Sequence, residues 1–265
     1  MNHKRISYMC CLNFVFFVFV FTSTAMAQKM DNQERESIEK FLKTAKDVSV
    51  MKDQGRRTDS WIVDLDDGKK QGKGFFKLTN RNWSNPSGGD SFKYVLAGYE
   101  LDKMLDLNLV PPTVERKIQK KKGSLMLYLE PSIISEDQRV QQNLIPPDPD
   151  SFKKTMCDLV VFEHLIYFQS LCNQRDLENI LIQTDLDWKV WMVDLSDAFA
   201  PSPRLIEGCE ITDCSDNLLT KIENLSKEGI QARLGSYLSD EEIAALIIRK
   251  NLIVKKVKEL RSKKI

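Results

Sequence analysis

Histidine is almost absent from this chain, in which His3 and His164 are the only two among 265 residues. A multi-histidine metal centre is therefore excluded, and a Ser-His-Asp hydrolase is disfavoured, because both depend on histidine side chains. His164 stands among Val, Phe, Leu and Ile residues, so we predict that it packs in the core or at its boundary.

An excess of either charge is also missing, since 39 Lys and Arg residues balance 38 Asp and Glu residues. This balance favours neither a nucleic acid nor an acidic surface as a partner. Two basic runs, residues 117–122 and 255–264, are broken by apolar residues or lie at loops and ends. We interpret them as solvated faces.

Only six cysteines are present, and two of them fall in an apolar run near the N-terminus. Four cysteines in an exported chain favour disulfides. Cys209 and Cys214 are close enough in sequence to close a small loop, and they form the favoured bridge. Cys157 and Cys172 are predicted at opposite ends of one helix, too far apart to bridge if that helix is straight. The spacing fits no zinc pattern.

The apolar run near the N-terminus extends from Tyr8 to Phe21, follows Lys4 and Arg5, and precedes the small-x-small sequence Ala25-Met26-Ala27. This pattern predicts a secretory signal peptide over residues 1–27. The run is short for a membrane span, so an uncleaved anchor is the weaker alternative. We therefore expect a secreted or periplasmic protein with no membrane span after signal cleavage.

A strand-rich half precedes a helix-rich half in the mature chain. Prolines at 146, 147 and 149 mark the boundary between a predicted N-terminal lobe, residues 28–145, and a predicted helical lobe, residues 146–265. Strands are predicted at 60–65, 74–78, 109–118, 124–129, 180–182 and 190–193. Helices are predicted at 30–48, 92–105, 151–170, 216–225, 240–249 and 252–262. Ser239 and Glu242 form a predicted capping box.

The most informative segment is residues 173–199, NQRDLENILIQTDLDWKVWMVDLSDAF. Asn179 ends a polar loop and leads into an apolar strand, and a second apolar strand ends on Asp194. An amide oxygen and a carboxylate at the ends of one hairpin can converge on the metal ions that bridge nucleotide phosphates. The order of these elements predicts ATP with Mg²⁺ or Mn²⁺ as cofactor, and a hairpin with polar ends is the alternative.

A lysine on a strand is also needed to meet the phosphates. Lys77, in GFFKL, is the candidate, because a lysine among apolar neighbours needs an anionic partner. Lys73 is the reserve candidate, and an edge strand that exposes Lys77 to water is the alternative. Glu100 or Asp102, on the following helix, is available to hold the lysine, although either is also compatible with a solvated helix face.

Several segments resemble a bacterial family of exported kinase-like proteins, whose relatives include HipA-type and phosphoinositide-kinase-like enzymes. They are IEKFLKTAKDVSV, FFKLT, AGYELDKMLDLNLVPPTVERKI, KGSLMLYLE, RDLENILI and WKVWMVDLSDAF. The resemblance covers most of the mature chain and implies an α+β, two-lobed protein-kinase-like fold with ATP between the lobes. It also implies site residues: Lys77 as the nucleotide lysine, Leu129 and Glu130 near the adenine-binding linker, Asn179 and Asp194 as metal ligands, and Arg175 beside the catalytic aspartate.

Three positions depart from the family pattern. The catalytic aspartate is replaced by Gln174, an amide that cannot act as a general base, and Asp176 is the candidate substitute. The glutamate of the helix falls at Val95, which cannot pair with Lys77. The glycine-rich turn is replaced by Gln54-Gly55-Arg56-Arg57.

These departures favour an exported, pseudokinase-like or weakly active protein that keeps a nucleotide and metal cleft. One alternative is an active, divergent ATP-dependent kinase or nucleotidyl transferase with Asp176 as base and an unknown protein or small molecule as acceptor. A loose transition state makes a general base partly dispensable, so Gln174 alone does not exclude this alternative. The other is a non-catalytic interaction scaffold.

Overall fold

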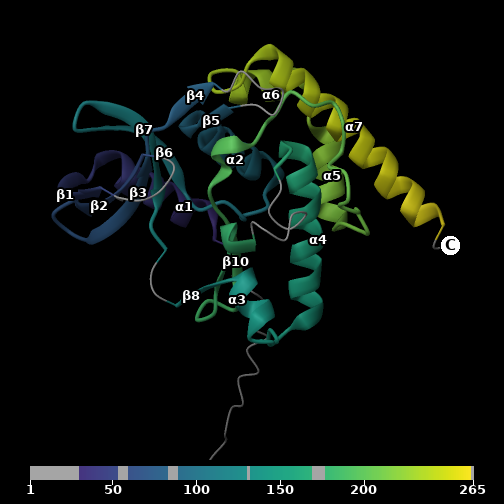
Figure 1. Cartoon of the computed structure of the whole chain (residues 1–265), viewed down its shortest axis with the longest axis horizontal. Coiled ribbons are helices and arrows are strands. Elements are labelled where there is room, and N and C mark those ends of the chain that lie inside the picture. The colour runs from purple at the N-terminus through teal and green to yellow at the C-terminus, as the bar shows by residue number, and fades with distance from the viewer. Residues whose placement is uncertain (1–29, 53–58, 83–88, 130–131, 169–176, 264–265) are drawn as a thin grey trace, which may run out of the picture.

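The computed structural model describes residues 30–52, 59–82, 89–129, 132–168 and 177–263 (Figure 1). Several sequence predictions lie outside these residues. They are the signal peptide over 1–27, the turn over 54–57, Glu130, Cys172, and the loop residues Gln174, Arg175 and Asp176.

Five antiparallel strands form the main sheet, in the order β1-β2-β3-β7-β6. They are β1 (Lys46–Lys52), β2 (Ser60–Asp66), β3 (Gln71–Lys77), β7 (Lys121–Leu127) and β6 (Thr113–Ile118). The predicted strands at 60–65 and 74–78 are confirmed as β2 and β3. The strand predicted from residue 109 begins only at Thr113, after the two prolines at 111 and 112. The five-stranded sheet lies on one side of the molecule, and most of the helices lie on the other (Figure 1).

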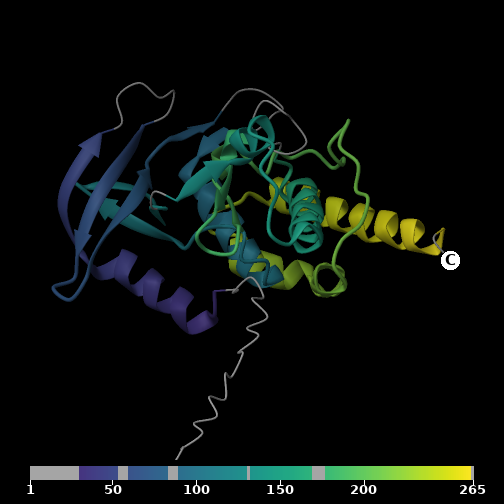
Figure 2. The ribbon, with the colours of Figure 1, turned by 90° about the horizontal axis from the view of Figure 1, so that it is seen from below.

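Helix α1 (Asn32–Thr44) covers one face of this sheet (Figure 2). The Asp31 side chain caps its first turn by accepting a hydrogen bond from the Glu34 N–H. Phe41 and Leu42 are buried against the sheet. The prediction that this helix continues to Val48 was wrong, because the backbone is extended from Ala45 onward and Val48 lies in β1.

Helix α2 (Phe92–Leu105) packs against both the sheet, where it contacts β6 and β7, and the helical half, and its predicted bounds are confirmed. It follows a short ladder of β4 (Asn80–Asn82) and β5 (Gly89–Ser91). Ser91 caps the helix by accepting a hydrogen bond from the Lys93 N–H at 3.2 Å. The last residue of β5 is therefore also the N-cap of α2, which fixes the position of Asp90 relative to the helix.

The helical half contains α3 (Glu136–Gln141), α4 (Pro149–Ile166), α5 (Asp216–Asn224), α6 (Lys227–Leu234) and α7 (Asp240–Ser262). A three-stranded sheet accompanies them, in the order β10 (Lys189–Met192), β9 (Ile180–Gln183) and β8 (Ile133–Ser135). The capping box of Ser239 and Glu242 is confirmed at the start of α7. The two helices predicted at 240–249 and 252–262 are one continuous helix, because nothing between them breaks it. In the part of the chain described, no helix is both long and apolar enough to cross a membrane.

Arg249, on α7, is 0% exposed and binds three backbone carbonyls. Its Nε donates to the Leu165 carbonyl at 3.0 Å, and its Nη1 donates to the carbonyls of Ala200 and Ser202. Burial lowers the pKa of the guanidinium to about 10, still high enough for it to be charged at neutral pH. Arg249 thus joins α7 to the end of α4 and to the segment that follows Asp194.

The disulfide predicted between Cys209 and Cys214 was wrong. Cys214 is a buried free thiol, and Cys157 is also free, whereas Cys209 is disulfide-bonded. The partner of Cys209 therefore lies outside the described residues. Proximity in sequence was a poor guide because Cys214 is instead buried in the hydrophobic core beside helix α5.

His164, on α4, is a core residue as predicted, with 1% of its surface exposed. Its Nδ1 accepts a hydrogen bond from the Ile206 N–H at 3.1 Å, so the ring is neutral at that nitrogen. Burial lowers the pKa of the imidazole from 6.5 to about 4.

The lowered pKa of His164 predicts a pH dependence of stability. Unfolding takes up a proton between the folded pKa of about 4 and the unfolded value of 6.5. The stabilisation is therefore complete above pH 6.5 and is lost as the pH falls toward 4. Between pH 7 and pH 5, we expect the free energy of unfolding to fall by about 2 kcal/mol more in the wild type than in His164→Asn. Urea unfolding at each pH measures this difference, and asparagine keeps an acceptor for Ile206. Equal pH slopes in the two proteins would contradict the prediction.

Candidate functional site

The hairpin of β9 (Ile180–Gln183) and β10 (Lys189–Met192) places Asn179 and Asp194 at the same end. Ile180 pairs with Met192, and the next rung is the Val193 N–H donating to the Asn179 carbonyl at 2.9 Å. Asp194 then adopts a left-handed conformation with φ 60° and ψ 41°, and 47% of its side chain is exposed. The turn directs its carboxylate back toward the sheet, where it meets Lys77.

Lys77 is the last residue of β3 and is 4% exposed. It lies in the middle of the sheet, opposite Ser60 on β2 and Ser124 on β7. The close approach of β7 at this point needs Gly123, because a Cβ there would lie 2.3 Å from the Lys77 carbonyl oxygen. The prediction of a buried lysine on this strand is confirmed, and the alternative of an exposed edge lysine is excluded.

The Lys77 ammonium donates to Asp194 Oδ1 and to Ser196 Oγ, across more than a hundred residues of sequence. Ser196 is 4% exposed and itself lies 3.2 Å from Asp194 Oδ1. It belongs to the short 3-10 turn η2 (Leu195–Asp197), against which α2 packs. Lysine, carboxylate and hydroxyl therefore form one hydrogen-bonded group that joins the sheet to the helical half.

Two further carboxylates lie next to this group. Asp90, on β5, is 4% exposed and has its Oδ1 at 3.9 Å from the Lys77 ammonium. Asp197 keeps an exposed surface, yet desolvation of its carboxyl group and the negative charge of Asp194 raise its pKa to about 6. Among the described residues, one cation faces three acidic side chains, so this group carries an excess of negative charge when all three are ionised. Such an excess favours a further cation.

The oxygen atoms available here suit a hard divalent cation. Mg²⁺ binds carboxylate and amide oxygens and is commonly held by one or two carboxylates together with substrate phosphates. Within the described residues, no group of three or more His, Cys, Asp or Glu side chains is arranged to hold a metal alone. Asp194 and Asn179 lie at the same end of the hairpin, and they do not form a complete metal site by themselves.

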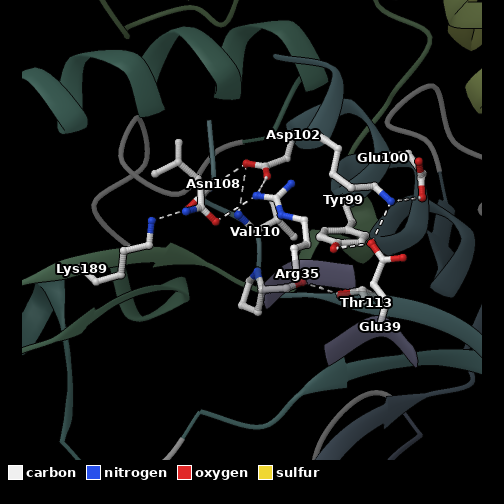
Figure 3. Close-up of polar contacts among 12 residues, drawn as sticks. Arg35, Glu39, Tyr99, Glu100, Asp102, Asn108, Val110, Thr113 and Lys189 are labelled. Atoms are coloured by element: carbon white, nitrogen blue, oxygen red, sulfur yellow. Dashed lines mark hydrogen bonds and ion pairs between the residues drawn. The ribbon is translucent and has the colours of Figure 1, made fainter. Parts of the chain in front are cut away.

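Glu100 does not lie near Lys77, which corrects the predicted pairing. Its carboxylate forms ion pairs of 2.9 Å with Lys103 and with Arg233. Asp102, the other acid considered, is buried beside Arg35 and accepts hydrogen bonds from the Leu109 and Val110 N–H groups (Figure 3). Both acids are therefore paired with groups other than Lys77.

The remaining predicted site residues lie apart from this group or outside the described residues. Lys73 is exposed on β3 and is not part of the Lys77 group. Leu129 is half-buried and follows β7, two residues after its end. Glu130, Arg175 and Asp176 lie outside the described residues, so their roles stay predictions.

Sequence reasoning missed Asp90, Ser196 and Asp197. Asp90 ends a run of loop-forming residues, and its place just before the N-cap of a helix was a usable signal. Ser196 and Asp197 follow Asp194 in one turn, so the spacing Asp-x-x-Asp pointed to a second acid at the same place. Their contacts with Lys77 depend on tertiary structure.

No family model matches the sequence, and no curated protein matches it either. Solved structures do match the fold. A hydra Fam20 structure with sugar has a TM-score of 0.63 at 14% identity, covering 88% of this chain and 91% of that one. The Golgi casein kinase with Mn/ADP bound has a TM-score of 0.61 at 12% identity, covering 88% and 77%.

The Helicobacter pylori proinflammatory kinase CtkA matches more distantly, with a TM-score of 0.51 at 9% identity, covering 84% of this chain and 96% of that one. Identities this low bear on the fold alone. The strand-rich N-terminal sheet and the helical half that follows it are matched in all three comparisons over most of the chain. The protein has a two-lobed, protein-kinase-like fold.

Proposed function

We propose that this protein binds ATP or ADP together with Mg²⁺ or Mn²⁺ at a site to which Lys77, Asn179 and Asp194 contribute. One observation carries the proposal: a buried strand lysine contacts the aspartate that ends the β9–β10 hairpin. Burial of a lysine is costly, and its position beside a half-exposed carboxylate suits a site where phosphate and metal meet. The Mn/ADP in the Golgi casein kinase structure supports the same ligand class.

In this proposal each residue of the chain has a separate task. Lys77 neutralises a phosphate oxygen, while Asp194 and Asn179 supply the oxygen ligands of the metal. The metal, when bound, offsets the negative charge of the phosphates. The Ser196 hydroxyl fixes the relative positions of the lysine and the aspartate through its hydrogen bonds to both.

We further propose that phosphotransfer is weak or lost. Gln174 stands where a general base is expected, and an amide cannot accept the proton of an acceptor hydroxyl. Val95, on the first turns of α2, is buried in the core and offers no charge to Lys77. The protein is thus proposed as an exported, pseudokinase-like nucleotide binder, with a protein or a small molecule as partner.

Thermal stability of the purified, oxidised protein tests the proposal. We expect ATP or ADP with Mn²⁺ or Mg²⁺ to raise the melting temperature. At saturating ligand, the free energy of unfolding should increase by a few kcal/mol. Neither the metal alone nor the nucleotide with a chelator should reproduce the full shift. The absence of any shift at millimolar nucleotide with either metal would overturn the proposal and favour the interaction scaffold.

A radiolabel transfer assay separates a pseudokinase from an active enzyme. We expect incorporation of labelled phosphate into the chain or a general acceptor to stay near background. Label incorporation that disappears in Asp176→Ala would replace the pseudokinase proposal with the active-kinase alternative.

A further inference from the structure

A divalent cation that binds Asp194 would compete with Lys77 for this carboxylate and weaken their contact. The lysine ammonium occupies Oδ1 of that aspartate, and two cations on one oxygen repel each other. Because Lys77 is 4% exposed, water cannot take the place of the lost carboxylate. A buried ammonium without an anionic partner is strongly unfavourable. The nucleotide phosphate can supply one anionic partner, and a second acid within reach would hold the ammonium in place while it meets that phosphate oxygen.

Asp90 has the position and the free atom that this role needs. Its Oδ1 is buried, receives no hydrogen bond from the described residues, and lies 3.9 Å from the Lys77 ammonium. A movement of about 1 Å would turn this approach into a charge-assisted hydrogen bond. An orphaned buried carboxylate oxygen is costly, so a donor is expected to approach it.

The fold holds Asp90 in place from both sides. β5 pairs with β4, and the next residue, Ser91, caps α2. β5 also packs against the turn η2 that carries Ser196. Asp90 therefore approaches Lys77 from the N-terminus of the helix, whereas the position expected for a helix glutamate is occupied by Val95.

We propose that Asp90 is the positioning residue for Lys77, which pairs with Asp194 in the free chain and shifts to Asp90 when metal and nucleotide bind. This inference rests on the proposed function, because it requires a cation at Asp194. Asp90 then does the work of the missing helix glutamate: it keeps the lysine charged and directed at phosphate while Asp194 turns to the metal.

A double-mutant cycle on the purified full chain tests the inference. The proteins are the wild type, Asp90→Asn, Lys77→Met and the double variant, and the probe is ADP with Mn²⁺ measured by calorimetry. We expect Asp90→Asn to weaken binding about tenfold in the wild type and less than twofold in the Lys77→Met background. Asp90→Glu, which keeps the charge, should recover part of the loss.

The comparison variant is Glu100→Gln, because Glu100 is the acid that its position on helix α2 alone would suggest as the partner of Lys77. Its effect on ADP affinity should be small and equal in both backgrounds, because its partners are Lys103 and Arg233. An equal loss for Asp90→Asn with and without Lys77 would overturn the inference. So would a cycle in which Glu100, and not Asp90, is coupled to Lys77.

Melting temperatures without ligand separate this inference from the proposed function. We expect Asp90→Asn to lower the melting temperature when Lys77 is present, and to leave it unchanged or raise it when Lys77 is methionine. If no protein of the set binds ADP with Mn²⁺, the proposed function fails. The cycle of melting temperatures without ligand still measures the coupling between Asp90 and Lys77 in that case. If ADP binds and neither cycle shows coupling, the inference fails and the proposed function stands.

Discussion

The Asp194→Asn variant is expected to bind ADP with Mn²⁺ at least about a hundredfold more weakly than the wild type, a loss of about 2.7 kcal/mol. The neutral amide removes the charge that a divalent cation needs and keeps the size of the side chain. Asparagine also tolerates the left-handed backbone of this position, with φ 60° and ψ 41°, whereas alanine would add about 1–2 kcal/mol of strain. The measurement is titration calorimetry with and without Mn²⁺.

The matched control is Asp187→Asn, in the turn of the same hairpin. Asp187 is exposed and also left-handed, with φ 46°, so the exchange is chemically and conformationally equivalent. Its affinity for ADP with Mn²⁺ should stay within about twofold of the wild type. If Asp194→Asn bound ADP with Mn²⁺ as tightly as the wild type, Asp194 would not belong to the site, and the proposed function would be wrong.

Replacing Arg249 with methionine is expected to lower the free energy of unfolding by about 3–5 kcal/mol. The substitution leaves the carbonyls of Leu165, Ala200 and Ser202 without their donor in a buried place. Each lost partner costs about 1–3 kcal/mol, and relief from burying a charge offsets part of the sum. Urea unfolding gives the value directly.

Two variants bracket this result. Arg249→Lys keeps a charge but cannot reach all three carbonyls with one ammonium, so we expect an intermediate loss. Lys256→Met lies on the exposed face of the same helix and should change the free energy of unfolding by less than about 0.5 kcal/mol. If Arg249→Met were as stable as Lys256→Met, the buried arginine would not hold the segment that follows Asp194.

The fold was predictable wherever local signals marked an element at both ends. Helix α2 was placed correctly because Ser91 is a good N-cap and the apolar pattern ends at Leu105. Helix α1 was extended too far, since the Ala45–Val48 segment suits a helix locally and pairs in the sheet only through contacts with β2. Helix α6 was missed, although Ser226 caps it. Its short sequence mixes polar and apolar residues without a clear face.

The site was predictable in its parts and not in its connections. Lys77 and Asp194 each follow from a strand and the residue that ends it, which is local information. That they contact each other depends on how two lobes pack. Glu100 was assigned by its place on α2, but the helix turns that side chain toward Lys103 and Arg233. Asp90 lies in a polar segment whose approach to Lys77 depends on the pairing of β4 and β5.

The contacts of Arg249 also bear on the order of events in folding. They join residues 47, 49 and 84 positions apart in sequence, and contacts of this range form late because chain closure must precede them. The residues after Asp194 thus take their final path only when the last helix has docked. We therefore expect nascent or truncated chains that lack α7 to carry every residue of the proposed nucleotide site without the contacts that hold the segment after Asp194.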